Sequence, residues 1–431
     1  MMYKYFAKKI FYLPAILFCL FQINGMAQLV NNGTTITITS GGILYAGMDI
    51  TNATNGAITN EGKIFSTGNL VNVNSATLSG NGIYSVQGNF TNTGTYNQDN
   101  SLLEFFGDNN SKLKNKTGII YNLQVNKNSN KNVILQGKEK ILNSITFLQD
   151  KNWIKLGKNV LTLANNCTIL NYSKDRFIIT NAAGSLKKLN IGNSPFTFPV
   201  GYTNKTYNPL VITEAGTADD YSVQALEHAL LQGSTGNPVS SGGIDAAWFI
   251  EEAVAGGGNA IIEANWKNTD ELPNFDYTKC MVVRYNGTRW DYKPAQAGVA
   301  TGTNYRSISR SGFSAFGDFT VLSVNNPSFT GNAFTVNNKT GAVNTNGEAV
   351  IKVYPTLVQQ NHITVDVPGG LKNIQKMSIN ITDVNGKIVY QKQDTGFQQQ
   401  QINLPDLAQG IYFVNILYDT KKFIQKIIVS R

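Results

Sequence analysis

Hydrophobic and polar residues alternate in short segments along most of this 431-residue chain. Such alternation is typical of β-strands with one buried and one solvated face. The clearest run lies at the C-terminal end, from Glu348 to Arg431, where Asn385-Gly386 supplies the two positive-φ positions of a tight hairpin. The pattern predicts a small, immunoglobulin-like β-sandwich over residues 348–431.

A second pattern is a repeat of the form Gly-x-apolar-x-Asn-x-Gly-x-apolar. It occurs at residues 56–64 and 88–96, with a partial copy at 68–72. Short strands with Asn and Gly at the corners suit a solenoid of stacked coils, because Asn tolerates left-handed backbone and stacks in ladders. The sequence therefore predicts a parallel β-helix-like region over residues 28–178, with a sandwich as the alternative.

Residues 179–325 show no repeat, and we expect a β-sandwich module there. Trp248 and Trp266 lie within apolar runs that are typical of central strands, and Asn286-Gly287 predicts a hairpin. One segment, 223–231, is compatible with a short helix or with an edge strand. The predicted fold class of the whole chain is all-β.

The N-terminal residues 1–27 have the features of a secretory signal peptide. Lys4, Lys8 and Lys9 precede an apolar stretch, Ile10–Phe21, which is followed by small residues. This stretch is shorter than the ~20 apolar residues that a spanning helix needs. We find no later segment that is apolar enough to span, so the sequence predicts an exported protein without a transmembrane segment.

Three motifs in the C-terminal segment carry a family resemblance. They are Val353-Tyr354-Pro355, the stretch from Asp383 through Gly386-Lys387 to Val389, and the closing stretch from Leu407 to Tyr412. A final basic-apolar strand, which runs to the last residue, adds to the resemblance. Together they resemble the type A C-terminal sorting domain of the type IX secretion system of Bacteroidetes, also called the Por secretion tail. Thr356-Leu357 follow Pro355 where the family more commonly has Asn-Pro. The predicted sorting-signal residues are Tyr354, Pro355, Asp383, Gly386, Lys387, Gly410, Ile411 and Tyr412.

This resemblance implies that residues 348–431 are an address recognised by the type IX secretion machinery. It further implies a secreted or outer-surface protein whose tail a sortase-like peptidase removes. The segment 326–347 is rich in Asn, Gly and Thr, which is typical of a linker, and we expect processing there. The order of strands in 28–178 resembles the right-handed β-helix segments of Bacteroidetes surface proteins and adhesins.

Charge and cysteine content exclude several classes of function. The net charge is +9, and removal of the three leader lysines leaves +6 without a basic run interleaved with aromatic residues. Nucleic-acid binding is therefore not supported, whereas weak attraction to anionic polysaccharide is compatible with the sequence. Cys167 and Cys280 lack zinc-site spacing, and we predict two buried free thiols, with a single disulfide as the alternative.

Few residues offer catalytic chemistry. His228 and His362 are the two histidines of the chain, and they lie in different predicted modules. Ser314 lies in a sequence that superficially resembles a nucleophile elbow, but the spacing is one residue too long. We therefore predict no catalytic residue, no metal site and no cofactor.

Carboxylates are a further class of candidates, because enzymes that cleave polysaccharides use clustered acids. The adjacent pairs Asp219-Asp220 and Glu251-Glu252 lie outside the predicted solenoid. Neighbouring side chains on a strand point to opposite faces, so neither pair is arranged to flank one bond. The acids of the solenoid are scattered, and a solvated surface role is favoured for them. These acids are Asp49, Glu61, Asp99, Glu104 and Asp108.

Four tryptophans complete the candidates. Trp248 and Trp266 are expected in the core, since apolar residues surround them, and Trp153 offers no specific signal. Trp290 follows the predicted hairpin turn and is expected to be exposed, which makes it a candidate contact for a glycan or another surface ligand.

The sequence thus predicts a non-enzymatic, adhesin-like protein, secreted or displayed at the cell surface. The alternative is a secreted protein that binds or degrades polysaccharide in the groove of its β-helix. A glycan or surface ligand is the expected partner besides the secretion machinery.

Overall fold

The computed structural model describes residues 28–324, 351–358, 361–366, 377–384, 386–394, 399–418 and 421–430. Among these residues the regular structure is β-strand, apart from two short 3₁₀ helices, η1 (Asn268–Asp270) and η2 (Pro294–Gln296). The all-β prediction is confirmed. The chain divides into two compact units between Gly331 and Asn332. The predicted signal peptide and the predicted linker lie outside the described residues.

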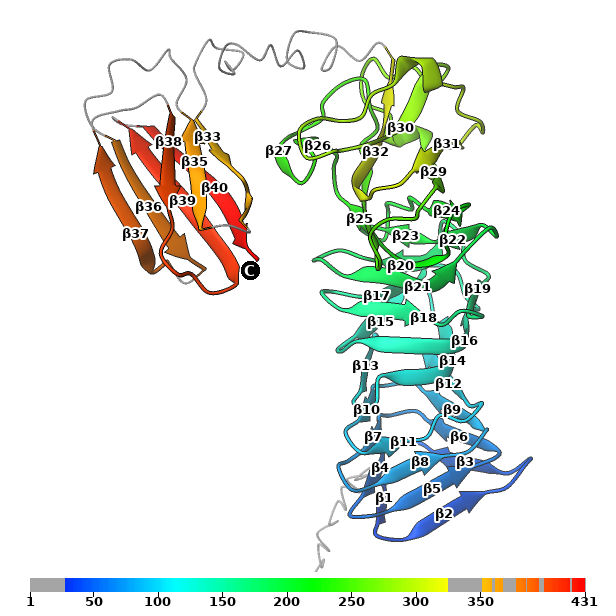
Figure 1. Cartoon of the computed structure of the whole chain (residues 1–431). Helices are drawn as coiled ribbons and strands as arrows, with labels where there is room; N and C mark the ends of the chain where they lie inside the picture. Colours follow the sequence, from blue (N-terminus) through cyan, green and yellow to red (C-terminus); the bar gives the residue numbers. More distant parts are fainter. Residues whose placement is uncertain are drawn as a thin grey trace, which may run out of the picture. The chain divides into compact units, whose positions relative to one another are not determined.

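A β-solenoid of about eight turns forms the first part of the first unit (Figure 1). Its strands stack in parallel, and each turn adds one strand to a nine-stranded sheet. One side is a nine-stranded sheet of β1 (Leu29–Asn32), β4 (Ile50–Ala53), β7 (Leu70–Asn72), β10 (Phe90–Asn92), β13 (Ser111–Asn115), β15 (Lys131–Leu135), β17 (Asn152–Lys155), β20 (Arg176–Ile179) and β23 (Val200–Gly201). These stacked parallel strands confirm the predicted β-helix-like fold. We call residues 28–201 the solenoid.

Two further sheets close the solenoid. A four-stranded sheet, present in the first turns, consists of β2 (Thr35–Ile38), β5 (Ala57–Asn60), β8 (Thr77–Ser79) and β11 (Thr95–Tyr96). The solenoid strands of the third sheet are β3 (Ile43–Ala46), β6 (Lys63–Ser66), β9 (Ile83–Val86), β12 (Leu102–Gly107), β14 (Ile119–Lys127), β16 (Glu139–Phe147), β18 (Val160–Leu163), β19 (Thr168–Leu170) and β21 (Ser185–Ile191). The solenoid is therefore three-sheeted in its early turns (28–108) and has two main sheets in its later turns (109–201).

A buried row of asparagines, the asparagine ladder, runs through the early turns and ends in the first of the later turns. Its members are Asn31, Asn52, Asn72, Asn92 and Asn115. Each of the first four donates its side-chain amide N–H to the side-chain oxygen of the next, at 2.8–2.9 Å. Asn52 and Asn72 are fully buried and also donate to backbone carbonyls at the corners. The ladder satisfies polar groups that would otherwise be unpaired inside the solenoid.

The repeat copies found in the sequence are not all equivalent in the structure. Residues 68–72 and 88–92 lie on successive turns, because Leu70 pairs with Phe90 in the nine-stranded sheet. The copy at 56–64 instead spans the corner between β5 and β6, and its Asn60 is not a ladder residue. The true period follows the ladder, with Asn52, Asn72 and Asn92 twenty residues apart.

The second part of the first unit continues the solenoid without a break in the sheet. The thirteen-stranded sheet extends through antiparallel strands β25 (Asp219–Leu226), β28 (Ala247–Glu252), β32 (Gly317–Ser323) and β30 (Cys280–Arg284). A second antiparallel sheet contains β22 (Phe196–Phe198), β24 (Leu210–Glu214), β29 (Ala260–Lys267) and β31 (Tyr305–Phe313), and a small hairpin contains β26 (Leu230–Gln232) and β27 (Thr235–Pro238). A short helix or an edge strand was compatible with the sequence of 223–231, and the structure contains strands there.

One hydrophobic core extends from the solenoid into this region. It includes Ile50 and Phe90 of the early turns together with Trp248 and Trp266, all fully buried. The prediction that Trp248 and Trp266 belong to the core is confirmed. The hairpin at Asn286-Gly287 is also confirmed, since Asn286 N–H donates to Arg289 O at 2.9 Å and Gly287 has φ +91°.

The second unit contains two sheets around one core. A three-stranded sheet contains β33 (Lys352–Tyr354), β35 (His362–Asp366) and β38 (Gln399–Asn403). A five-stranded sheet contains β34 (Leu357–Val358), β40 (Lys421–Val429), β39 (Gly410–Tyr418), β36 (Met377–Asp383) and β37 (Ile388–Asp394). The shared core includes Ile363, Ile379 and Val414, each fully buried.

Candidate functional site

The turn between β36 and β37 contains three of the predicted sorting-signal residues. Lys387 N–H donates to Asp383 Oδ1 at 2.9 Å, and Asp383 N–H donates to Lys387 O at 3.0 Å. Gly386 has φ +82°, a conformation that glycine adopts without steric cost. The Asp, Gly and Lys of this motif thus build the turn, with Gly386 and Lys387 exposed at its tip.

Strand pairing brings this turn next to the closing motif. Asp383 is the register partner of Tyr412 on the adjacent strand β39. Tyr412 is 8% exposed, and its hydroxyl donates to Ala408 O at 3.0 Å, so it anchors the segment that leads into β39. Ile411, one residue earlier, is 38% exposed and points to the other face.

The opening motif reaches the same end of the five-stranded sheet. Pro355 lies between β33 and β34, so it connects the two sheets of the second unit. Thr356 O accepts a hydrogen bond at 2.8 Å from Ile428 N–H, and Ile428 is the register partner of Ile411. Three motifs that lie far apart in the sequence therefore converge on neighbouring strands. Tyr354, Lys387 and Ile411 are the exposed side chains that one residue of each motif contributes.

Trp290, the candidate ligand contact in the first unit, is not exposed. Its side chain is 2% exposed, its ring nitrogen donates to Leu230 O at 3.2 Å, and its ring packs edge-on against Tyr285 at 5.6 Å. The prediction of an exposed Trp290 is wrong, because the hairpin folds back over β26 and buries the indole. Trp290 is a core residue and is not available for stacking on a sugar.

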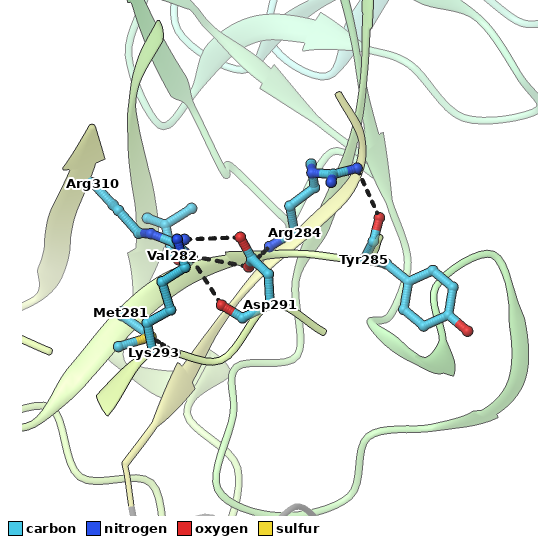
Figure 2. Close-up of polar contacts among 7 residues, drawn as sticks. All are labelled: Met281, Val282, Arg284, Tyr285, Asp291, Lys293 and Arg310. Atoms are coloured by element: carbon cyan, nitrogen blue, oxygen red, sulfur yellow. Dashed lines mark hydrogen bonds and ion pairs between the residues drawn. The ribbon is translucent and has the colours of Figure 1, made fainter. Parts of the chain in front are cut away.

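A buried ion pair lies beside this hairpin (Figure 2). Arg310 on β31 donates to both carboxylate oxygens of Asp291, at 3.0 and 2.8 Å, and to Val282 O at 2.9 Å. Asp291 Oδ1 also accepts the Arg284 N–H at 2.6 Å. The pair fastens the segment after the hairpin to β30 and β31. The sequence pattern alone did not reveal this pair, although a charged residue at an inward position of a strand is a recognisable signal.

The acidic pairs considered for catalysis have structural partners. Asp219 Oδ2 accepts the Val254 N–H at 2.9 Å. Asp220 accepts the Asn190 N–H at 3.0 Å and forms an ion pair with Lys187 at 3.1 Å. These carboxylates therefore fix the loops around β25.

The other acidic pair, Glu251-Glu252, alternates across β28, with Glu251 exposed and Glu252 partly buried. Burial, together with the neighbouring Asp219 and Glu214 carboxylates, raises the pKa of Glu252. The two carboxylates do not face one another, as the strand argument predicted.

The acids of the solenoid connect neighbouring turns. Asp49 accepts the Asn69 N–H at 2.7 Å, and Asp99 accepts the Gly80 N–H at 2.8 Å. Glu61 accepts a hydrogen bond from the side-chain amide of Asn81 at 3.1 Å, and Asp108 accepts one from the side-chain amide of Asn128. Four of the five scattered acids thus hold adjacent turns together at the surface.

Glu104 is the fifth acid and the most buried, at 8% exposure. Its carboxylate accepts hydrogen bonds from Ser85, Gln124 and Asn126 and lies 3.9 Å from Lys63 Nζ. Burial alone would raise the pKa of Glu104, but these partners hold it below its usual value. Glu104 therefore stays ionised on the outer face of the thirteen-stranded sheet.

A row of aromatic rings lies beside Glu104 on the same face. Tyr45 stacks on Phe65 with centroids 5.4 Å apart, and Phe65 lies 4.5 Å from Phe106. Lys63 Nζ lies 5.5 Å from the Phe65 centroid. Tyr45 is 65% exposed, so the row reaches solvent at its N-terminal end. Aromatic rings supply apolar area and nearby polar groups can fix the orientation of a ligand, so this face combines both kinds of contact.

Both cysteines are buried and free, as predicted, and they do not form the alternative disulfide. Burial raises the pKa of the Cys167 thiol to about 12 and of the Cys280 thiol to about 12. Both stay protonated at neutral pH, which makes them poor nucleophiles.

His228 Nδ1 lies 2.6 Å from Asp245 Oδ1 at the surface. His362 is the first residue of β35, and Ser314 lies between β31 and β32, where a nucleophile elbow would need a following helix. Within the described ranges no group of three or more His, Cys, Asp and Glu side chains is arranged to hold a metal ion. None of the described helices is long and apolar enough to cross a membrane.

Comparison with known proteins bears on the second unit. Residues 352–430 match the family described as the secretion system C-terminal sorting domain. No curated protein matches the chain. The matched span contains all the predicted sorting-signal residues and nearly the whole of the second unit. Residues 352–430 are therefore a type IX C-terminal sorting domain, which indicates export of this chain by type IX secretion to the medium or the outer surface.

Proposed function

We propose that residues 28–324 are a non-enzymatic, adhesin-like binding protein that the sorting domain delivers to the cell exterior. The observation that carries this proposal is that the reactive side chains of this region have structural roles. The thiols of Cys167 and Cys280 are buried, and the carboxylates of Asp219 and Asp220 hold loops in place. The solenoid meanwhile offers a long, regular surface for contacts with a partner.

A second candidate function is binding or cleavage of a polysaccharide on the outer face of the thirteen-stranded sheet. The aromatic row of Tyr45, Phe65 and Phe106 beside the ionised Glu104 favours it. A glycan array and a reducing-sugar assay on the purified secreted protein separate the two candidates. Binding without turnover supports the adhesin-like function, and turnover of any glycan contradicts it. Failure to bind or cleave any glycan on a broad panel contradicts the second candidate.

We further propose that a sortase-like peptidase removes the sorting domain by cutting within 326–347, after a signal peptidase has removed residues 1–27. Mass spectrometry of the surface or medium form tests both cuts. A mature protein that begins near Gln28 and ends before Lys352 is expected. A full-length chain at the surface contradicts the proposal.

The role of the tail has its own test. Deletion of residues 348–431 should abolish export and leave the protein in the periplasm, because all three converging motifs are lost. Immunoblotting of periplasmic, surface and medium fractions measures this. The matched variant Lys392→Gln changes the same sheet outside the motifs and should be exported normally. Unchanged surface levels of the deletion variant would count against the tail as the address.

A further inference from the structure

Charged side chains are distributed unevenly along the solenoid. The early turns (28–108) contain one basic residue, Lys63, and five acidic residues. The later turns (109–201) contain fourteen Lys and Arg residues and three acidic residues. The later turns are thus a strongly basic segment within a chain of small net charge. The positions of these charges in space depend on the fold.

Three of these lysines lie at one corner of the solenoid, on successive turns. Lys116 connects β13 to β14, Lys138 connects β15 to β16, and Lys158 connects β17 to β18. All three side chains are exposed. Successive parallel strands are about 4.8 Å apart, so the corners place these lysines in a column along the solenoid axis.

Backbone and side-chain hydrogen bonds stack the three corners directly. Lys140 N–H donates to Gly118 O at 2.7 Å, which joins the first corner to the second. The side chain of Asn159 donates to Leu135 O at 3.1 Å, which joins the third corner to the second. These bonds hold the backbone of the three corners one above the next, and each corner contributes one lysine.

The adjoining side of the nine-stranded sheet widens the column. Lys112 and Lys114 are exposed on β13. Lys112, Ile134 and Lys155 are register partners on three successive strands, so Lys155 lies on the same face as Lys112. We call the six residues Lys112, Lys114, Lys116, Lys138, Lys155 and Lys158 the lysine corner.

Acidic residues of the later turns do not neutralise the lysine corner. Glu139 is buried inside the solenoid at 2% exposure, where it accepts the Asn115 N–H at 3.2 Å. Asp150 and Asp175 lie at the opposite corner and pair with Arg176 and Lys174. None of the six lysines forms an ion pair with a residue that the structure describes.

Repulsion between the charges of the lysine corner is unfavourable for the stability of the isolated protein. The column places its charges within or close to the Debye length of about 8 Å at physiological salt, so they repel each other. A flexible polyanion would relieve this repulsion along its length.

We propose that the lysine corner is a docking surface for an anionic polysaccharide, whose carboxylate or sulfate groups lie along the column. Charge complementarity is the argument for this occupant. A nucleic acid is disfavoured because the corner segments 112–118, 136–140 and 155–159 contain no aromatic residue on which bases could stack. The proposal rests on the binding role proposed for residues 28–324 and supplies the chemical class of the ligand.

The test compares two triple variants of the secreted protein. Lys116→Gln, Lys138→Gln and Lys158→Gln remove the column, and Lys205→Gln, Lys267→Gln and Lys279→Gln remove three exposed lysines elsewhere. Binding to heparin, alginate, neutral dextran and single-stranded DNA is measured at two salt concentrations. Thermal unfolding followed by tryptophan fluorescence checks that both variants fold.

We expect salt-sensitive binding of the wild type to heparin and alginate, with no binding to dextran. The column variant should bind both polyanions about tenfold more weakly and with a smaller salt dependence, whereas the control variant should bind like the wild type. Equal losses in both variants, no loss in either, or equally tight binding of DNA would overturn the docking surface. A protein that cleaves glycans yet loses polyanion binding in the column variant would overturn only the adhesin-like function.

Discussion

The early and the later turns of the solenoid belong to one continuous stack but fill their interiors differently. In the early turns identical asparagines stack at intervals of about twenty residues and satisfy one another. In the later turns the interior polar groups are unique. Lys127 is fully buried and donates to Gln87 O, Phe106 O and Ser111 Oγ, and Glu139 accepts the Asn115 N–H at the end of the ladder.

This difference explains where a repeat is visible in the sequence. A ladder needs the same side chain at the same place on each turn, so it fixes both residue type and turn length. Single buried groups impose no such rule, so the later turns keep their register without a repeated side chain. Where the ladder ends, at Asn115, the repeat fades while the fold continues.

The largest expected effect comes from breaking the ladder. Asn72→Ala should lower the free energy of unfolding of the first unit by about 4 kcal/mol, because it leaves several buried partners without a hydrogen bond. Urea unfolding followed by tryptophan fluorescence measures this, since all four tryptophans lie in the first unit. Asn143→Ala, at an exposed position of the later turns, is the control and should change stability by less than about 0.5 kcal/mol. Similar losses for both would contradict the ladder's role.

Replacement of one glycine by alanine in the early turns and of one in the later turns should have opposite effects on the stability of the first unit. A Cβ at Gly94 would lie against the carbonyl oxygens of Ala76 and Val73, the latter at 2.7 Å, whereas a Cβ at Gly137 would meet nothing within 4 Å. Gly94→Ala should therefore destabilise the first unit by about 2–3 kcal/mol.

Gly137→Ala should be neutral or stabilising by about 0.5 kcal/mol, because it reduces the entropy of the unfolded chain. Neither glycine has φ in the left-handed region, so packing alone separates the two outcomes. The same urea titration provides the measurement. Equal effects at the two positions would contradict a difference in packing between the early and the later turns.

The last expected effect depends on pH. Burial raises the pKa of Glu139 to about 8 from an ordinary value of 4.5. The folded protein therefore holds a proton between pH 4.5 and 8 that the unfolded chain releases, and stability falls as pH rises through this window. Glu139→Gln should be neutral at pH 4 and should stabilise by about 2 kcal/mol at pH 8. A gain of the same size at both pH values would contradict a neutral, buried Glu139.

Much of the fold was predictable from local patterns. Alternation predicted strands, and the Asn and Gly repeat predicted a solenoid, because corner geometry restricts residue type. The tail motifs predicted a sorting domain, and its hairpin residues Asp383, Gly386 and Lys387 are tied to backbone conformation. These signals are short-range, so one sequence carries them.

Side-chain environment was less predictable. The turn before Trp290 suggested exposure, but burial there depends on Leu230, sixty residues away. The pairing of Arg310 with Asp291 and the burial of Lys127 likewise depend on contacts between strands that are distant in sequence.

The sequence alone therefore determined the strand rhythm, the solenoid and the export address of this protein, since each follows from residues close together in the chain. Only the tertiary structure decided that three tail motifs meet at one end of a sheet and that lysines from three turns form one column. The physical reason is that register between turns is set by strand pairing over some twenty residues. The residues that surround a charged side chain are determined only once that register is fixed.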